Sequence, residues 1–203
     1  VDHVQHGRVD PRTLGFALPH GAESRDFATV VGELSRSSDV HAAIDSLEPP
    51  FARFRALESL LGRYRALAAD SGLTALPALR TTLRPGSRWS GTGALRALLA
   101  ATGDAPEAAA NAEAGPDADE LDSALAEGVK RFQLHHGLVA DGIIGRLTLA
   151  ALRTPFASRV AQIELTMERW RWLSGLDAPR LIIVNIPEFH LYALEGSANG
   201  ART

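Results

Sequence analysis

The chain has 203 residues, of which 45% are hydrophobic and 22% are charged, and its formal net charge is −3. This balance is typical of globular domains, and it excludes general affinity for nucleic acid, which requires clustered Lys and Arg. Because there is no cysteine, disulfides, thiolate nucleophiles and Cys-ligated metals are excluded within these residues.

No apolar run approaches the roughly 20 residues that a transmembrane helix needs, so no membrane span is expected in this chain. The first residue is Val1, and the only methionine is Met167. We therefore expect that a segment before Val1 was removed, a cleaved signal peptide being one candidate.

The N-terminal part of the chain is predicted to become helical after an irregular start. Residues 1–21 contain Gly and Pro without a helical period, which predicts extended arms and turns. Residues 25–47 predict two short helices broken near Ser37, with Ser38 as the cap of the second. The apolar face of that second helix is expected to be Val40, Ile44 and Leu47.

The clearest early helix is predicted to begin at Pro49-Pro50 and to end before Gly72. Its apolar residues alternate three and four apart, which indicates one buried stripe: Phe54, Leu57, Leu61, Tyr64 and Ala68. The arginines beside this stripe are interpreted as a solvated face, and a polyanion site is the alternative.

A turn, a short helix and a long loop follow. Pro85-Gly86 has the residue order of a type II turn. Leu95–Ala101 is predicted to be a helix that ends at Gly103. The loop from Ala105 to Ala118 is rich in Ala, Pro and acidic residues with nothing large to bury, which predicts a mobile surface loop.

A compact pair of helices is predicted between Asp119 and Leu152. Asp119 is expected to cap the first, with Asp122 at the third position of a capping-box-like arrangement. The apolar face of this helix is Leu121, Leu125, Val129 and Phe132. Turn residues follow at close spacing, with a glycine opening the second helix: Gly137, Asp141, Gly142 and Gly145.

This segment resembles the three-helix peptidoglycan-binding module found on many bacterial cell-wall enzymes. The residues that carry the resemblance are Val129, Phe132, Gln133, Gly137, Leu138, Asp141, Gly142, Gly145, Thr148 and Leu152. With the turn and helix before them, the resemblance covers residues 83–152. The loop at 105–118 departs from it, because this loop is longer than the family's usual link between the first two helices.

Polar positions near the turn form a candidate peptidoglycan-binding site, a shallow groove for glycan or stem peptide: Gln133, His136, Asp141, Arg146 and Thr148. Asp141 is interpreted as bonding its own turn in preference to a ligand. No metal site is expected, because the adjacent His135 and His136 point in different directions on a helix and have no third ligand at metal spacing. No cofactor is expected either.

A longer helix is predicted after the module, with Thr154 as its cap and Pro155 in its first turn. Its apolar face is Phe156, Val160, Ile163, Met167 and Trp170. Trp170 is interpreted as a core residue, whereas Trp172 stays open between a core role and a binding role.

Two apolar runs then predict a short β-hairpin, with strands Leu181–Ile186 and Phe189–Leu194 around a turn at Pro187-Glu188. Two strands alone are marginal in water, so this hairpin is expected to need more sheet.

The order of these parts resembles the large L,D-transpeptidases of bacterial envelopes, in which a helical scaffold and a peptidoglycan-binding module precede a β-rich catalytic domain. The stretch "LIIVNIPEFHLYALEG" matches the first strands of that domain. The resemblance implies that a Cys thiolate, aided by a His, attacks the peptide bond of a donor stem and passes the acyl group to an amine on a neighbouring stem. Neither the nucleophile motif nor its His occurs here, so this chain alone is expected to be inactive, with no catalytic residue.

The expected fold is mainly α, with a short C-terminal β-hairpin. Four parts are expected: a helical scaffold region at 1–82, a three-helix peptidoglycan-binding module at 83–152, a connecting helix packing on the scaffold at 153–178, and the first strands of an incomplete catalytic domain at 179–203. The expected location is the bacterial periplasm or cell envelope, and the expected partner is peptidoglycan. A swapped or edge-paired homodimer through the hairpin is the other partner considered.

The alternative function is a stand-alone peptidoglycan-binding protein or the targeting module of a cell-wall hydrolase such as an amidase or carboxypeptidase. The apolar hairpin argues against the first, and missing His and Asp metal ligands argue against the second. A helix-turn-helix DNA binder is excluded, because Gly137–Gly145 is too long for its turn and the net charge is wrong.

Overall fold

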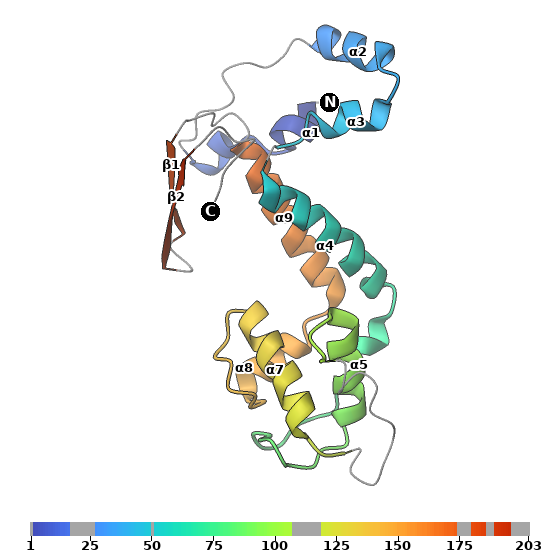
Figure 1. Ribbon diagram of the computed structural model, residues 1–203, viewed down its shortest axis with the longest axis vertical. Coiled ribbons are helices and arrows are strands. Elements are labelled where there is room, and N and C mark those ends of the chain that lie inside the picture. Colours follow the sequence, from blue (N-terminus) through green and yellow to red (C-terminus); the bar gives the residue numbers. More distant parts are fainter. Residues whose placement is uncertain are drawn as a thin grey trace. The chain divides into compact units, whose positions relative to one another are not determined.

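The computed structural model describes most of the chain and is mainly helical (Figure 1). The described residues are 2–16, 27–49, 51–106, 119–173, 180–185 and 189–195. The chain divides into two compact units: unit 1 comprises Val1–Leu61 and Ala161–Thr203, and unit 2 comprises Gly62–Val160. No helix in the described ranges is long and apolar enough to cross a membrane.

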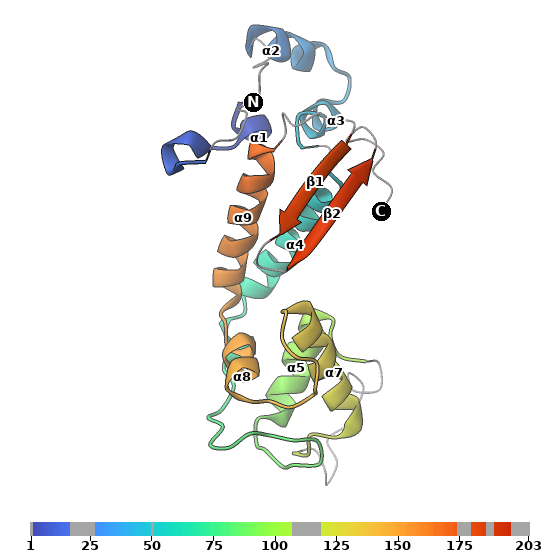
Figure 2. The same cartoon turned by 90° about the vertical axis from the view of Figure 1, so that its left-hand side faces the viewer.

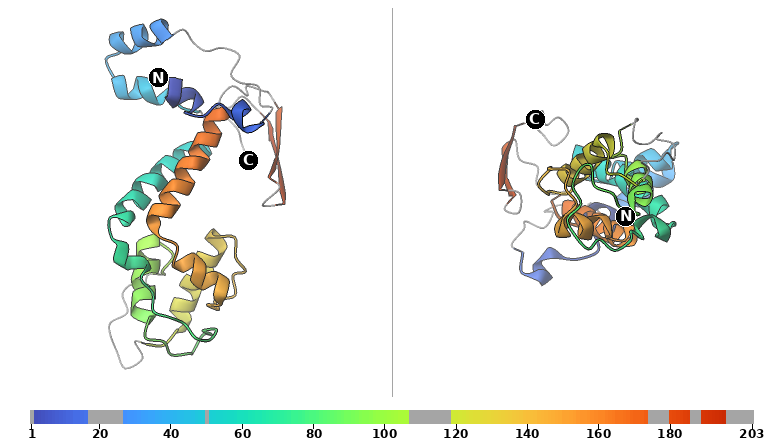
Figure 3. Two further views of the ribbon diagram at one scale, coloured as in Figure 1. Left: turned by 180° about the vertical axis from the view of Figure 1, so that it is seen from behind. Right: turned by 90° about the horizontal axis from the view of Figure 1, so that it is seen from below.

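The two units differ in secondary structure (Figures 2 and 3). Unit 1 contains α1 (Asp2–His6), the 3-10 helix η1 (Pro11–Leu14), α2 (Phe27–Arg36), α3 (Val40–Asp45) and the strands β1 (Arg180–Asn185) and β2 (His190–Glu195). Unit 2 contains η2 (Ser71–Thr74), α5 (Thr92–Thr102), α7 (Ser123–His135) and α8 (Arg146–Leu152). Both units include part of the longer helices α4 (Ala52–Ala68) and α9 (Phe156–Trp172).

The start of the chain is more helical than its sequence predicts. Asp10 caps η1, because its carboxylate accepts a hydrogen bond from the Arg12 N–H at 2.9 Å. Further along, the Glu168 carboxylate of α9 accepts hydrogen bonds from the Arg8 and Val9 N–H groups at 2.5 and 2.8 Å. The prediction of extended arms is therefore wrong for α1 and η1. Asp10 caps η1, and Glu168 satisfies the N–H groups of two residues between these helices.

The predicted break between α2 and α3 is confirmed, but the cap and the apolar face of α3 differ from the prediction. The cap is Asp39 and not Ser38, because the Asp39 carboxylate accepts from the backbone N–H three residues on, at 3.0 Å. Val40 and Ile44 are exposed, whereas Leu47 is buried. Leu47 lies beyond the end of α3, so it does not share one helical face with the other two.

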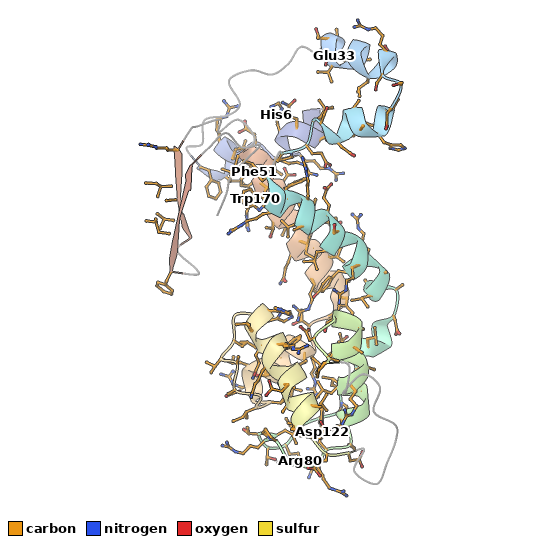
Figure 4. All side chains as sticks on the ribbon, viewed as in Figure 1. His6, Glu33, Phe51, Arg80, Asp122 and Trp170 are labelled. Carbon is orange, nitrogen blue, oxygen red and sulfur yellow. The ribbon has the colours of Figure 1, made fainter. Side chains whose placement is uncertain are left out.

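The predicted apolar stripes of α4 and α9 are buried at six positions: Phe54, Leu61 and Tyr64 on α4, and Phe156, Ile163 and Met167 on α9. The other predicted members are half-buried: Leu57, Ala68, Val160 and Trp170. In unit 2, the ring of Tyr64 packs edge-on against Phe156, with centroids 5.7 Å apart. In unit 1, the rings of Phe51 and Trp170 lie 5.0 Å apart, and Figure 4 shows the two side chains together. Aromatic pairs therefore join the two helices within each unit.

Both ends of α9 differ from the prediction in detail. The Thr154 hydroxyl donates to the Ala150 carbonyl of α8 at 3.1 Å, which is a bond back to the preceding helix and not a cap on α9. Trp172 is buried, with its ring 5.7 Å from that of Phe16, whereas Trp170 is only half-buried. Trp172 is therefore the more deeply packed of the two tryptophans.

The strands β1 and β2 pair in one continuous antiparallel register. The predicted turn at Pro187-Glu188 lies outside the described residues, so the complete hairpin stays a prediction. Several apolar side chains of this segment are exposed: Ile182, Val184, Phe189 and Leu191.

The helices α5, α7 and α8 of unit 2 share one apolar core, which is formed by Leu95, Leu98, Leu99, Leu121, Leu125, Val129, Phe132, Ile144 and Leu152. Gly86 has a φ of 82°, as the predicted type II turn requires. Leu83 exchanges two backbone hydrogen bonds with Ile144, at 3.1 and 2.9 Å. The opening turn is thus tied to the segment just before α8.

Helix α7 begins later than predicted, because Asp122 and not Asp119 caps it. The Asp122 carboxylate accepts from the backbone N–H three residues on, at 2.7 Å. The Asp119 carbonyl instead accepts from the Trp89 N–H at 2.7 Å, and the Leu121 N–H donates to the Ser87 carbonyl at 2.9 Å. This extended pairing with the opening turn keeps the residues before Asp122 out of the helix.

Candidate functional site

Gln133 lies at the centre of the predicted site, in the last turn of α7, with only 1% of its surface exposed. Its amide nitrogen donates to the Asp141 carboxylate at 2.9 Å and to the Ile143 carbonyl at 3.0 Å. The same nitrogen lies 3.1 Å from the Thr148 hydroxyl, and its amide oxygen accepts from the Gly142 N–H at 2.9 Å. This Gln133 network uses both polar atoms of the amide internally and ties α7, the turn and α8 together.

Asp141 closes its own turn. Its carboxylate accepts a hydrogen bond from the Ile143 N–H at 2.9 Å in addition to the one from Gln133. These two bonds, the backbone one foremost, hold the pKa of Asp141 below its usual value. The predicted hydrogen bond between Asp141 and its own turn is therefore present.

Thr148 is the third member of the predicted site that bonds within the Gln133 network. It is buried on α8, and its hydroxyl donates to the Ile143 carbonyl at 3.3 Å while accepting from Gln133. Gln133, Asp141 and Thr148 are thus brought together, but they bond one another and the turn. A ligand could reach the amide of Gln133 only if this turn opened.

His136 lies at the end of α7 and packs against Phe132, apart from the Gln133 network. Its ring packs against Phe132 in a tilted arrangement with centroids 4.0 Å apart, and its Nε2 atom is buried without a hydrogen-bond partner. Burial lowers the pKa of His136, and the nearby charge of Arg159 acts in the same direction. The histidine is therefore part of a packed aromatic and cationic contact, not of the Gln133 network.

Arg146, at the first position of α8, is exposed, and so is Asp141 in the turn. Exposed apolar side chains occur in the same part of unit 2, on the end of α7, the turn and the start of α8: Leu134, Val139 and Leu147. Sequence analysis did not select them. The available signal was that Leu134 and Leu147 fall outside the core positions of their helices, which leaves an apolar residue facing solvent.

A second polar cluster joins the ends of α5 and α7. The Asp104 carboxylate is buried, and it accepts from the Thr102 hydroxyl at 2.5 Å and pairs with the His135 Nδ1 at 2.6 Å. The His135 ring itself is largely exposed. Among the described residues, no group of three or more His, Cys, Asp or Glu side chains is arranged to hold a metal ion.

Unit 1 contains a carboxyl pair near the start of α4. Burial, followed by the hydrogen bond that protonated Glu48 donates to the side chain of Glu58, raises the pKa of Glu48 to about 7. The charge of Arg171 opposes this shift, and Asp45 adds to it. The pair therefore holds a proton near neutral pH.

Two protein families match parts of the chain. A family model described as "Putative peptidoglycan binding domain" matches residues 93–152, which include nearly all of α5, the whole of α7 and α8, and every residue of the predicted site. A model described as "Scaffold domain" matches residues 1–61, the N-terminal segment of unit 1. A comparison with curated proteins found no match.

The chain combines a scaffold domain with a peptidoglycan-binding domain. The match at 93–152 agrees with the resemblance found in the turn and helix residues of that segment, and it indicates a protein of the cell envelope. Neither match identifies a catalytic activity.

Proposed function

We propose that this chain is the peptidoglycan-binding and scaffold portion of a bacterial cell-wall L,D-transpeptidase, an enzyme that crosslinks stem peptides in the periplasm through a Cys acyl-enzyme. The observation that carries the proposal is the peptidoglycan-binding match on α5, α7 and α8. The order of the parts supports it further, since the scaffold match precedes this domain and the strands β1 and β2 follow it.

The proposed division keeps four parts. They are the scaffold region at 1–82, the module at 83–152, the connecting helix at 153–178 and the first strands of a catalytic domain at 179–203. The exposed apolar side chains of β1 and β2 support the last part, because such a face is normally covered by further structure. A second copy of the chain pairing at this edge is the other way to cover it.

The role of the chain in the reaction is to hold the enzyme on its polymeric substrate. Binding through one module makes the encounter between the enzyme and neighbouring stems effectively intramolecular, which raises their local concentration. There is no cysteine among the 203 residues. In the proposed enzyme the thiolate nucleophile is therefore supplied by sequence outside them.

A stand-alone peptidoglycan-binding protein, or the targeting module of a wall hydrolase, is the alternative. The match at 93–152 favours it equally, because this match concerns binding and not catalysis. The scaffold match and the exposed strand face favour the transpeptidase.

The test is a crosslinking assay with purified muropeptides that carry tetrapeptide stems. The parent protein, expressed with all residues encoded beyond Thr203, is expected to form crosslinked dimers, and a Cys→Ala variant of it is expected to form none. The 203-residue chain is expected to be inactive. Crosslinking by this chain, or hydrolysis without crosslinking by the parent, would overturn the proposal.

A further inference from the structure

We propose that the peptidoglycan-binding domain contacts the stem peptide of peptidoglycan through an exposed apolar surface formed by Leu134, Val139 and Leu147, with the guanidinium of Arg146 beside it. The inference rests on the proposed function and deepens it, because it names the part of the polymer that is bound and the side chains that bind it.

The exposure of these three side chains is the first argument. Leu134, Val139 and Leu147 are exposed at 69%, 80% and 62%, more than the other large hydrophobic side chains described in unit 2. The nine residues of the apolar core shared by α5, α7 and α8 are at most 1% exposed. Three such residues in one small domain indicate a surface kept apolar for contact with another molecule.

The Gln133 network ties together the three segments that carry these residues, namely the end of α7, the turn and the start of α8. Leu134 follows Gln133 directly, and Leu147 precedes Thr148, the hydrogen-bond partner of Gln133 at 3.1 Å. The carbonyl of Val139 accepts from the Asp141 N–H at 3.0 Å, within the same turn. Leu134 and Leu147 are therefore next to network residues in the sequence, and Val139 is hydrogen-bonded to one.

The packing of α7 against the turn agrees with this placement. A Cβ added at Gly142 would lie 3.3 Å from the Cγ and Cε atoms of Lys130, so the stem of Lys130 covers the turn. Leu134 lies four residues after Lys130, which puts the two on the same side of the helix. Leu134 thus stands at the edge of the turn that carries Val139.

The polar groups of the network are already hydrogen-bonded within the protein, so contact with the stem peptide is assigned to the exposed apolar side chains. Gln133 and Thr148 are buried and bonded to protein groups, and the Asp141 carboxylate accepts from Gln133 and from its own turn. Freeing such groups for a ligand would leave buried partners unsatisfied, which is costly. The neighbouring exposed residues can bind without that cost.

The chemistry of the surface fits a stem peptide better than a sugar. Its apolar members are aliphatic, whereas pyranose rings usually stack on aromatic rings. Stem peptides present alanine methyl groups, which suit an aliphatic surface, and free carboxylates, which suit the planar guanidinium of Arg146.

The experiment uses the full chain with purified sacculi as the probe, measured by cosedimentation. The test variant combines Leu134→Gln, Val139→Thr and Leu147→Gln. The matched control is Leu165→Gln, because Leu165 is an equally exposed leucine, at 58%, on the part of α9 that belongs to unit 1. A second probe is glycan strand stripped of stems from the same sacculi by amidase digestion.

The triple variant is expected to bind sacculi about tenfold more weakly than wild type, while Leu165→Gln binds as wild type and all three chains unfold at the same temperature. Arg146→Gln is expected to weaken binding a few-fold and to reduce its salt dependence. The wild-type chain is expected to bind stripped glycan no more tightly than the triple variant binds whole sacculi.

Two results would overturn the inference while leaving the proposed function intact: wild-type affinity in the triple variant, or equal binding of stripped glycan and whole sacculi by the wild type. If the wild-type chain does not bind sacculi at all, the proposed function fails, and the inference fails with it.

Discussion

Unit 1 and unit 2 each hold a partly buried ionisable side chain, and the two side chains are of opposite charge type. In unit 1, burial and the neighbouring Glu58 raise the pKa of Glu48 to about 7. In unit 2, burial and the charge of Arg159 lower the pKa of His136. Both sites disfavour the charged form, which is a carboxylate in one unit and an imidazolium in the other.

Proton linkage then gives the two units opposite responses to pH. Folded Glu48 retains a proton that an unfolded chain loses near its ordinary pKa of 4.5, so its contribution to stability is complete below that value and is lost as the pH rises to about 7. Neutral His136 contributes stability above its ordinary pKa of 6.5, and this contribution is lost as the pH falls. Alkali therefore weakens unit 1, and acid weakens unit 2.

The units also differ in how their polar centres are satisfied. The amide of Gln133 is neutral and makes all its bonds internally, and the lowered pKa of Asp141 keeps the Gln133 network unchanged near neutral pH. The pair of Glu48 and Glu58 holds together only while it keeps a proton. Substitutions in the network should consequently have the larger effects, and those at the ionisable groups the smaller ones.

The largest effect is expected from Gln133→Leu. The substitution leaves the buried Gly142 N–H without its acceptor and removes the donor that Asp141, Ile143 and Thr148 share, so we expect a loss of about 3 kcal/mol in the free energy of unfolding of unit 2. Hydrogen exchange over residues 123–152 measures it. The control is Arg131→Leu, an exposed neighbour on α7, for which a change within about 0.5 kcal/mol is expected. Equal protection in the two variants would contradict the structural role of the amide.

A smaller loss is expected from Gly142→Ala. Gly142 has a φ of 72°, and an added Cβ would lie 3.2 Å from the Ala126 carbonyl oxygen, so we expect a cost of about 2 kcal/mol. Gly137→Ala is the matched control, because Gly137 has a φ of 65° with open space around it and should cost about 1 kcal/mol. Thermal unfolding of both variants compares them, and the account requires Gly142→Ala to be the less stable.

In unit 1, Glu48→Gln is expected to stabilise the protein at pH 8 by about 1 kcal/mol, a figure reduced for solvent screening because Glu48 is only partly buried. At pH 4 the substitution should have little effect. Urea unfolding followed by the fluorescence of Trp170 and Trp172 measures it, with Trp89 of unit 2 replaced by Phe. If the variant keeps the wild-type decline in stability between pH 4.5 and 7, the carboxyl pair is not its cause.

The smallest effect is expected from His136→Phe. The ring can still stack on Phe132 but cannot be protonated, so the loss of stability of unit 2 below pH 6.5 should shrink, by less than about 1 kcal/mol after solvent screening. Urea unfolding followed by Trp89 fluorescence at pH 7.5 and 5 measures it. An unchanged acid response in the variant would assign that response to another group.

The helices and their glycine stops could be predicted from the sequence because they depend on local rules. Gly86, Gly103, Gly137 and Gly142 all have positive φ values at the predicted turns and helix ends. The caps were harder to predict. Asp119 and Asp122 both have the right chemistry, and only the pairing of residues 119–121 with residues 87–89 selects the second.

The grouping of three candidate residues could be predicted, whereas their hydrogen bonding to one another and their burial could not. The motif identified Gln133, Asp141 and Thr148 as one group, and the structure brings them together. Whether they face solvent depends on how the turn folds back over α7, which no short sequence pattern specifies. The exposed residues Leu134 and Leu147 were missed for a related reason, since leucine in a helix is usually a core residue.

The most direct test of the central claim, that unit 2 anchors the chain to the cell wall, is a binding isotherm of the wild-type chain on purified sacculi with soluble muropeptides as competitor. The account predicts saturable recovery of the chain in the pellet and its release by the competitor. A folded chain that stays entirely in the supernatant at every sacculus concentration would contradict it.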